Sequence, residues 1–151
     1  MSQLRKYRFA YSAFVSALIA MGCFFLADIS VSTLGGERIF VYGFTLAFGG
    51  EIVRVIDGSV YSLSFQVSIF ALVLLMCLFL SSIAAVLSKE SFVNRLVACA
   101  LALGAGVLML VLPSQTGLLG FQFAYGSFLC SGFAFLSAVF DVLGFFFHPK
   151  K

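Results

Sequence analysis

The residues from Leu96 to Phe140 form an uninterrupted stretch of 45 residues without Asp, Glu, Lys or Arg. A single helix of that length would be about 68 Å long, roughly twice the hydrocarbon thickness of a bilayer, so the stretch must fold back on itself. The break falls at Pro113-Ser114-Gln115-Thr116-Gly117, a sequence typical of turns. The stretch therefore predicts two apolar helices joined by a short connection.

Two further charge-free stretches have the length of a membrane-spanning helix. Phe9–Ala27 has 19 residues, and the stretch from Gly58 to Ser88 contains an apolar body at Leu63–Leu87. The chain is 62% hydrophobic and 10% charged, against about 45–50% and 25% in soluble domains. We therefore expect an all-α integral membrane protein, a bundle of four transmembrane helices that forms one membrane domain over residues 1–151. Its expected spans are 9–27, 63–87, 95–112 and 118–141.

The basic residues predict the orientation of these spans. Four spans place the N-terminus, the connection between the second and third spans, and a tail at 142–151 on one side. That side holds seven of the nine Lys and Arg residues: Arg5, Lys6, Arg8, Lys89, Arg95, Lys150 and Lys151. Because cytoplasmic segments are enriched in basic residues, we expect both termini in the cytoplasm and the protein in the plasma membrane. Four tyrosines near the expected span ends fit an interfacial aromatic belt: Tyr7, Tyr11, Tyr61 and Tyr125.

The outer loop between the first two spans, 28–62, is long and rich in apolar residues. Large and small side chains alternate in Ile39–Phe48, Gly49-Gly50 follows, and Glu51–Ile56 is rich in β-branched residues. Two such runs on either side of Gly-Gly predict a β-hairpin. Its apolar side chains are our candidates for binding a partner: Tyr42, Phe44, Leu46, Phe48, Val53 and Val55.

The expected pairing of Phe48 with Glu51 would place Leu46 opposite Val53 and Phe44 opposite Val55. An isolated two-stranded hairpin is marginally stable in water, so its apolar face must rest on another surface. The outer ends of its own helices or another protein could provide that surface. In a third alternative, the uncharged run at 39–50 enters the membrane as a re-entrant segment, which would require a cavity or pore beside it.

Asp141 is the one acidic side chain within the expected spans. If the fourth span occupies about Gly120–Phe140, Asp141 lies at the inner headgroups. If the span is shifted inwards, Asp141 lies inside the membrane and needs a basic partner, which could be Arg5, Arg8 or Arg95. An acid within a span often marks an ion path.

The chain offers no residue set for catalysis or for a cofactor. Its single His lies in the tail, and no span contains paired carboxylates, a metal-ligand cluster or a nucleotide motif. The four cysteines lie in four different apolar stretches. No basic stripe is interleaved with exposed aromatics, which argues against nucleic-acid binding. We therefore expect no enzyme activity, cofactor or metal, and we expect the lipid bilayer as a partner.

Small residues recur at every fourth position in three of the expected helices. Such rows allow membrane helices to approach closely, either within one bundle or between copies of a homo-oligomer. The rows are Ser12, Ser16 and Ala20; Ala98, Ala102 and Gly106; and Cys130, Ala134 and Ala138.

The outline of four spans, two inner termini and a β-prone first outer loop is similar to the claudin-like tetraspan shape. The claudin first loop carries Trp and a cysteine pair, and this loop contains neither. Small multidrug transporters also have four short spans, but they use a membrane-embedded Glu in the first span, which Phe9–Ala27 lacks. No residue role is transferred from either family.

Two functions fit these expectations. The first is a non-enzymatic accessory subunit that binds a larger membrane partner through its outer loop and its Phe-rich helices. The second is a small homo-oligomeric channel or transporter in which Asp141 or a re-entrant segment at 39–50 lines the route.

Overall fold

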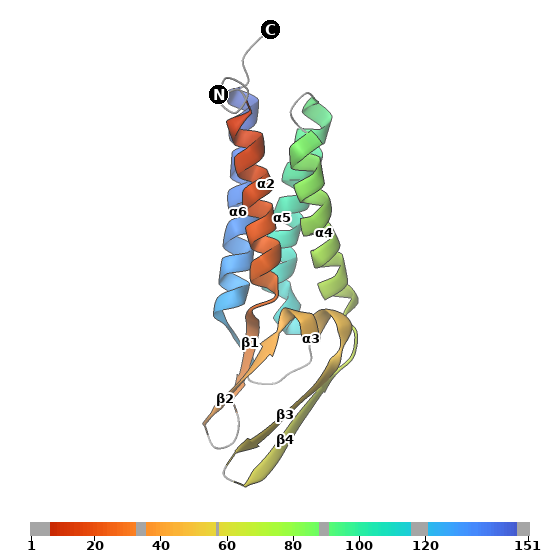
Figure 1. Cartoon of the computed structure of the whole chain (residues 1–151), viewed down its shortest axis with the longest axis vertical. Helices are drawn as coiled ribbons and strands as arrows, with labels where there is room; N and C mark the ends of the chain where they lie inside the picture. The colour runs from red at the N-terminus through yellow and green to blue at the C-terminus, as the bar shows by residue number, and fades with distance from the viewer. Residues whose placement is uncertain (1–6, 33–35, 57, 88–90, 116–120, 148–151) are drawn as a thin grey trace.

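The computed structural model describes residues 7–32, 36–56, 58–87, 91–115 and 121–147. Long helices lie side by side along most of its length, and short strands gather at one end (Figure 1). The long helices are α2 (Arg8–Phe24), α4 (Ile69–Leu87), α5 (Phe92–Gln115) and α6 (Tyr125–Phe146). The start of α2 and the end of α6 lie at the end of the bundle away from the strands, as do the end of α4 and the start of α5 (Figure 1).

The interior of the helical bundle is built largely from small side chains. The helices pack in a ring in the order α2, α4, α5 and α6, and α6 turns only small residues and one acid inward. Close approach brings many atoms into contact, so dispersion holds the helices together where lipid removes the hydrophobic driving force. The expected small-residue rows lie in this interior: Ser16, Ala20, Ala98, Ala102, Gly106, Cys130, Ala134 and Ala138 are buried, and Ser12 is half-buried.

Buried serines add hydrogen bonds between neighbouring helices. The Ser81 hydroxyl on α4 donates to the Ala98 carbonyl on α5 at 3.2 Å. The Ser137 hydroxyl on α6 donates to the Ala13 carbonyl on α2 at 2.9 Å. These two bonds join two of the helix pairs in the ring, and each satisfies a hydroxyl that would otherwise be buried without a partner.

The exterior of the bundle carries the large apolar side chains. Three helices, α4, α5 and α6, are long and apolar enough to cross a membrane, and α2 is an apolar helix of 17 residues. This distribution, with small residues inside and large apolar ones outside, is the arrangement expected of a bundle surrounded by lipid. Exposed examples are Leu18 and Ile19 on α2, Met76 and Phe79 on α4, Leu103 and Val107 on α5, and Phe128 and Val139 on α6.

The strands form two separate antiparallel sheets. In the first, β1 (Ala27–Ser32) lies between β2 (Arg38–Tyr42) and β5 (Phe121–Phe123). In the second, β3 (Gly50–Ile56) pairs only with β4 (Ser59–Phe65), and this two-stranded ribbon extends away from the helices (Figure 1). The short helix α3 (Gly43–Phe48) connects the two sheets across the end of the bundle.

The hairpin predicted around Gly49-Gly50 is wrong. Phe44, Leu46 and Phe48 lie on α3, so they do not pair with Val55, Val53 and Glu51. Gly49 has φ 76° and stands directly after α3, where glycine in a left-handed conformation commonly ends a helix. The real hairpin turn lies between Ile56 and Ser59, which pair with each other, and Gly58 in that turn has φ 78°.

The run at 39–50 therefore forms a strand, a short helix and the start of a second strand, and none of them lies between the long helices (Figure 1). The expected all-α class is likewise too simple, because the chain is mostly helical with small sheets. The expected second span began at 63, but α4 begins at Ile69 because Leu63 and Phe65 belong to β4. Tyr61 consequently lies on the ribbon and not at the end of a helix.

We expect that enlarging an interior side chain of α6 will destabilise the bundle while trimming an exterior one will not. Ala134 is fully buried, whereas Leu136 on the same helix is 39% exposed. Ala134→Leu should lower the stability by about 1–3 kcal/mol because the close-packed interior has no space for the added atoms. Leu136→Ala is the control, and thermal unfolding in mild detergent measures both. Equal shifts for the two variants would contradict the packing described here.

Candidate functional site

The Asp28 carboxyl is fully buried where the bundle meets the strands. Asp28 lies on β1 at an irregularity in the pairing with β2, which skips from Ala27 to Ile29. Its backbone carbonyl accepts hydrogen bonds from the Ala124 N–H at 2.9 Å and from the Ser127 hydroxyl. The bulge thus fixes the beginning of α6 to the central strand of the sheet.

Helix α3 closes over the Asp28 side chain. A Cβ on Gly43 would overlap the Phe24 carbonyl oxygen and would lie 2.5 Å from Asp28 Oδ2. Only glycine therefore allows α3 to begin here, with the Gly43 N–H donating to the Leu26 carbonyl at 3.4 Å. The Cys23 and Cys130 thiols lie close enough to the Asp28 carboxyl to interact with it electrostatically.

Burial changes the protonation of Asp28. Neither of its carboxyl oxygens has a hydrogen-bond partner among the described residues, so ionisation would leave a charge without compensation in a water-free environment. Desolvation raises the pKa of Asp28 from 3.8 to about 9. The folded protein therefore holds a neutral carboxylic acid at this position at neutral pH.

Asp141 is buried at the opposite end of α6, beside Arg95 of α5. Asp141 is 1% exposed and Arg95 is 7% exposed, and the two opposite charges attract each other. The guanidinium lies flat on Gly144, where a Cβ would come within 3.1 Å of its carbon Cζ, and its Nη1 donates to the Gly144 carbonyl. Arg95 is one of the three basic partners that the sequence offered for Asp141. Of the other two, Arg8 is exposed at the start of α2, and Arg5 lies outside the described residues.

The six candidate partner-binding residues separate into three places. Leu46 is 2% exposed and packs in the apolar core, so it cannot contact a partner directly. Tyr42, Phe44 and Phe48 are exposed on β2 and α3, and the rings of Phe44 and Phe48 lie 5.0 Å apart. Val53 and Val55 are exposed on the ribbon.

The exposed valines lie on one face of the ribbon, which we call the valine face. Val55 stands directly opposite Val60, and Val53 stands opposite Ser62. The three valines are each more than half exposed, whereas Ile52, Leu63 and Phe65 on the other face are half-buried. The sequence reasoning missed Val60 because it paired β3 with the wrong segment.

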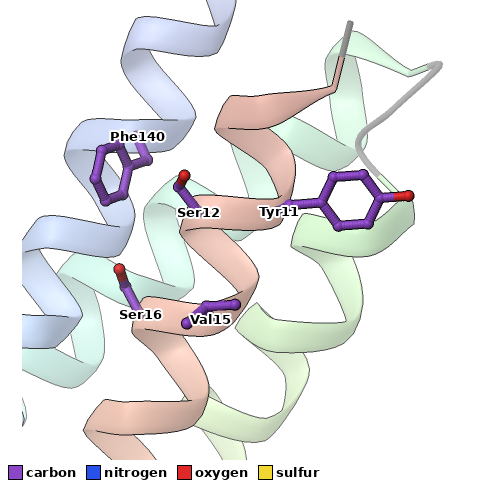
Figure 2. Close-up of a pocket in the computed structure, with 5 residues that line it drawn as sticks. All are labelled: Tyr11, Ser12, Val15, Ser16 and Phe140. Carbon is purple, nitrogen blue, oxygen red and sulfur yellow. The ribbon is translucent and has the colours of Figure 1, made fainter. Parts of the chain in front are cut away.

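A shallow hollow of about 320 Å³ lies between α2 and α6. Figure 2 shows Ser12 and Ser16 pointing from α2 toward α6, where Phe140 lies, while the ring of Tyr11 points away from Phe140. Val15 completes the lining. The hollow arises because two small residues one helical turn apart leave space on the outer surface of the bundle, and its lining carries no carboxylate, amine, imidazole or thiol.

The chain is thus a helical bundle with small sheets, a small-residue interior and three helices that are long and apolar enough to cross a membrane. No family model, curated protein or solved structure matches it. Any function must therefore be argued from the buried acids and the exposed surfaces described above.

We expect Asp28 to make the stability of the protein dependent on pH. Below about pH 4 the carboxyl is protonated in both the folded and the unfolded chain, whereas between pH 4 and about 9 only the folded chain retains the proton. This difference destabilises the fold progressively as the pH rises. Asp28→Asn should flatten the profile and raise the stability at pH 8 by at least about 1 kcal/mol.

The measurement for Asp28 is thermal unfolding in detergent between pH 4 and pH 9. Glu51→Gln is the control because Glu51 is an exposed acid on β3, and its profile should follow that of the unmodified chain. An unchanged slope in Asp28→Asn would show that Asp28 is already ionised in the folded protein.

We expect Arg95 and Asp141 to be coupled energetically. Arg95→Met should destabilise the bundle by roughly 3–5 kcal/mol because it leaves a buried carboxyl without a compensating charge. Asp141→Asn should also destabilise it, since the buried guanidinium then loses the attraction of this carboxyl. The double variant should be less destabilised than the sum of the two single variants, which a double-mutant cycle of unfolding free energies measures. Additive effects would argue against direct coupling.

Proposed function

We propose that this protein is a non-enzymatic membrane subunit that binds a larger membrane protein through the valine face of its ribbon. The single observation that carries the proposal is that the described residues leave the valine face uncovered, although Ile52 and Phe65 on the other face pack against the core. Val53, Val55 and Val60 lie in one cross-strand patch, and each is more than half exposed. Because an isolated two-stranded hairpin is marginally stable in water, a partner that covers the patch would stabilise it.

The outer edges of the ribbon also favour an interaction role. Among the described residues β3 pairs only with β4, so within that part of the chain each strand presents one edge without a neighbouring strand. Such edges can accept a strand from another protein, with backbone hydrogen bonds giving affinity and the flanking side chains giving specificity. Arg54 and Glu51 on β3 are exposed charges that would restrict the range of partners by electrostatic complementarity.

We propose that the chain crosses the plasma membrane four times and that both of its termini lie in the cytoplasm. The support for this topology is that α2 has 17 residues, the lower end of the range for a spanning helix of about 17–25 residues, and packs against α4 and α6 in a ring that contains three helices of spanning length. The two basic residues that the structure describes outside the strands, Arg8 at the start of α2 and Arg95 near the start of α5, lie at the end of the bundle away from the strands (Figure 1). The positive-inside rule would place that end in the cytoplasm and the ribbon outside the cell.

The Phe-rich helices offer a second, membrane-embedded contact for the same partner. Phe128 and Phe146 on α6 are strongly exposed, as are Phe70 and Phe79 on α4. The exposed rings on each of these two helices form an irregular outer surface against which a partner helix could pack, with lipid as the competing occupant.

The ion-path alternative has weaker support. Asp141 is shielded from the surface of the bundle, and its charge is opposed by that of Arg95. A residue on an ion path must meet water. A buried acid with an adjacent cation is also found where the pair has only a structural role between packed helices.

Native mass spectrometry of the protein, extracted gently from its own membrane, tests the proposed function. We expect a complex that contains this 16.3 kDa chain together with a different, larger chain. Val53→Lys/Val55→Lys should abolish the complex, and Val53→Thr/Val55→Thr should weaken it while keeping β-branched side chains in the strand.

Ser32→Lys is the matched control because Ser32 is an exposed residue at the end of β1 on the other sheet. It adds a charge outside the membrane without touching the ribbon and should leave the complex intact. A complex made only of this chain, together with ion flux in proteoliposomes that Asp141→Asn stops, would overturn the proposal.

A further inference from the structure

Helix α3 holds a fixed depth relative to the long helices. The N–H of Gly43, its first residue, donates to the Leu26 carbonyl just beyond the end of α2. Near its other end, the Leu46 carbonyl accepts from the Ser68 N–H just before α4 begins, at 3.1 Å. Helix α3 therefore lies across the bundle at the level where α2 ends and α4 starts (Figure 1).

The two faces of α3 differ sharply in how far their side chains are exposed. Leu46 and Ala47 are buried and belong to the apolar core of the protein. Phe44 and Phe48, which are one turn apart, are 58% and 50% exposed. A helix that buries one apolar face against its own protein and exposes two phenylalanines on the other has no reason to face bulk water.

Exposed aromatic residues continue from α3 around the same level of the bundle. Phe25 lies directly after α2, Phe70 lies in the first turn of α4, and Tyr125 is the first residue of α6. With Phe44 and Phe48 they define a set that we call the aromatic collar. The large apolar side chains of the helix exterior begin at the collar, and the exposed charges of this end, Glu37, Arg38, Glu51 and Arg54, lie on or beside the strands.

We propose that the aromatic collar contacts the headgroup and glycerol region of the outer lipid leaflet, with α3 lying in the membrane interface. A helix that lies in the plane of the interface inserts its exposed Phe side chains at the boundary between headgroups and acyl chains, and Tyr125 is of a residue type that is enriched in this zone. The collar is continuous with the apolar exterior of α4 and α6, so one lipid surface covers the collar together with the exterior of these helices. Phe44 and Phe48 then contact lipid, so within the segment between α2 and α4 partner binding falls to the ribbon beyond the membrane.

This inference rests on the spanning topology proposed above but not on the partner. It also implies that the ribbon begins at the membrane surface, because Gly49 and Gly50 follow α3 immediately. The valine face would therefore stand clear of the headgroups, accessible from water.

The chain contains no Trp, so a single introduced Trp reports its own environment without background. Four variants carry the test: Phe44→Trp and Phe48→Trp on α3, Val107→Trp on the exposed middle of α5, and Val55→Trp on the valine face. The purified full chain is reconstituted alone into phosphatidylcholine and phosphatidylglycerol vesicles. Quenching is measured with acrylamide in the water and with lipids brominated either near the glycerol or near the ends of the acyl chains.

We expect the Phe44→Trp and Phe48→Trp emission to be quenched more by bromine near the glycerol than by bromine near the chain ends. The Val107→Trp emission should show the opposite order. The Val55→Trp emission should be red-shifted relative to both, quenched by acrylamide and unaffected by either brominated lipid.

Three results would overturn the inference. Quenching of Phe44→Trp and Phe48→Trp by acrylamide alone would place α3 in water. Protection from both kinds of quencher would mean that a second copy of this chain covers the collar, and strongest quenching by bromine near the chain ends would place α3 deep in the bilayer. The Val107→Trp variant separates these failures from failure of the topology, because loss of its deep quenching would show that α5 does not cross the membrane.

Discussion

The close approach of helices through small side chains is the constraint on which the rest of this structure depends. In lipid, an apolar side chain gains little by leaving the surrounding acyl chains for a helix interface, so the helices must be held by dispersion and by hydrogen bonds across their contacts. Ala13, Ala98 and Ala134 let neighbouring backbones come near enough for both. The hydroxyls of Ser81 and Ser137 then reach carbonyls on the adjacent helices, which larger interior side chains would place out of range.

An interior built in this way admits small hydroxyls that bond across helix contacts, such as those of Ser81 and Ser137, and the two buried acids lie at its ends. Asp141 lies near the end of α6, where Arg95 enters from the beginning of α5. Asp28 lies where α2 has ended and β1, α3 and α6 converge. Their surroundings differ. Asp141 has the buried Arg95 guanidinium beside it, whereas Asp28 has two thiols and, among the described residues, no cation near it, and the cost of desolvation keeps it in the neutral acid form.

The sequence predicted where the long helices lie, because charge-free stretches are local features, but not where they end. Helix α5 continues through Pro113 to Gln115, beyond the expected end at 112, and α6 runs from Tyr125 to Phe146 where 118–141 was expected. The sequence left open whether the small-residue rows pack within one bundle or between copies, and they lie in the bundle interior. It predicted the strand region poorly. Ile39–Phe48 alternates as a strand should, and Gly49-Gly50 and Asp57-Gly58 are both hairpin turn sequences. Which of these two sequences forms the hairpin turn depends on whether Leu46 and Ala47 can pack against α4. That is a long-range contact, and no local sequence pattern contains it. The burial of Asp28 was missed for a similar reason: an acid directly after an apolar run looks like the solvated end of a span, and only the convergence of β1, α3 and α6 encloses it.

The junction at Asp28 also decides where any partner must meet this protein. Because α3 is joined to the end of α2 and to the start of α4, the ribbon that follows Gly49 leaves the bundle from a fixed point and points away from it (Figure 1). Gly49 packs closely against β4, since a Cβ at this position would lie 3.0 Å from the Phe65 carbonyl oxygen. A partner of the valine face would therefore need a domain that rises above the membrane beside this bundle. A partner confined to the bilayer could contact only the helix exterior. There it would have to displace lipid from exposed aromatic side chains, which already pack favourably against lipid.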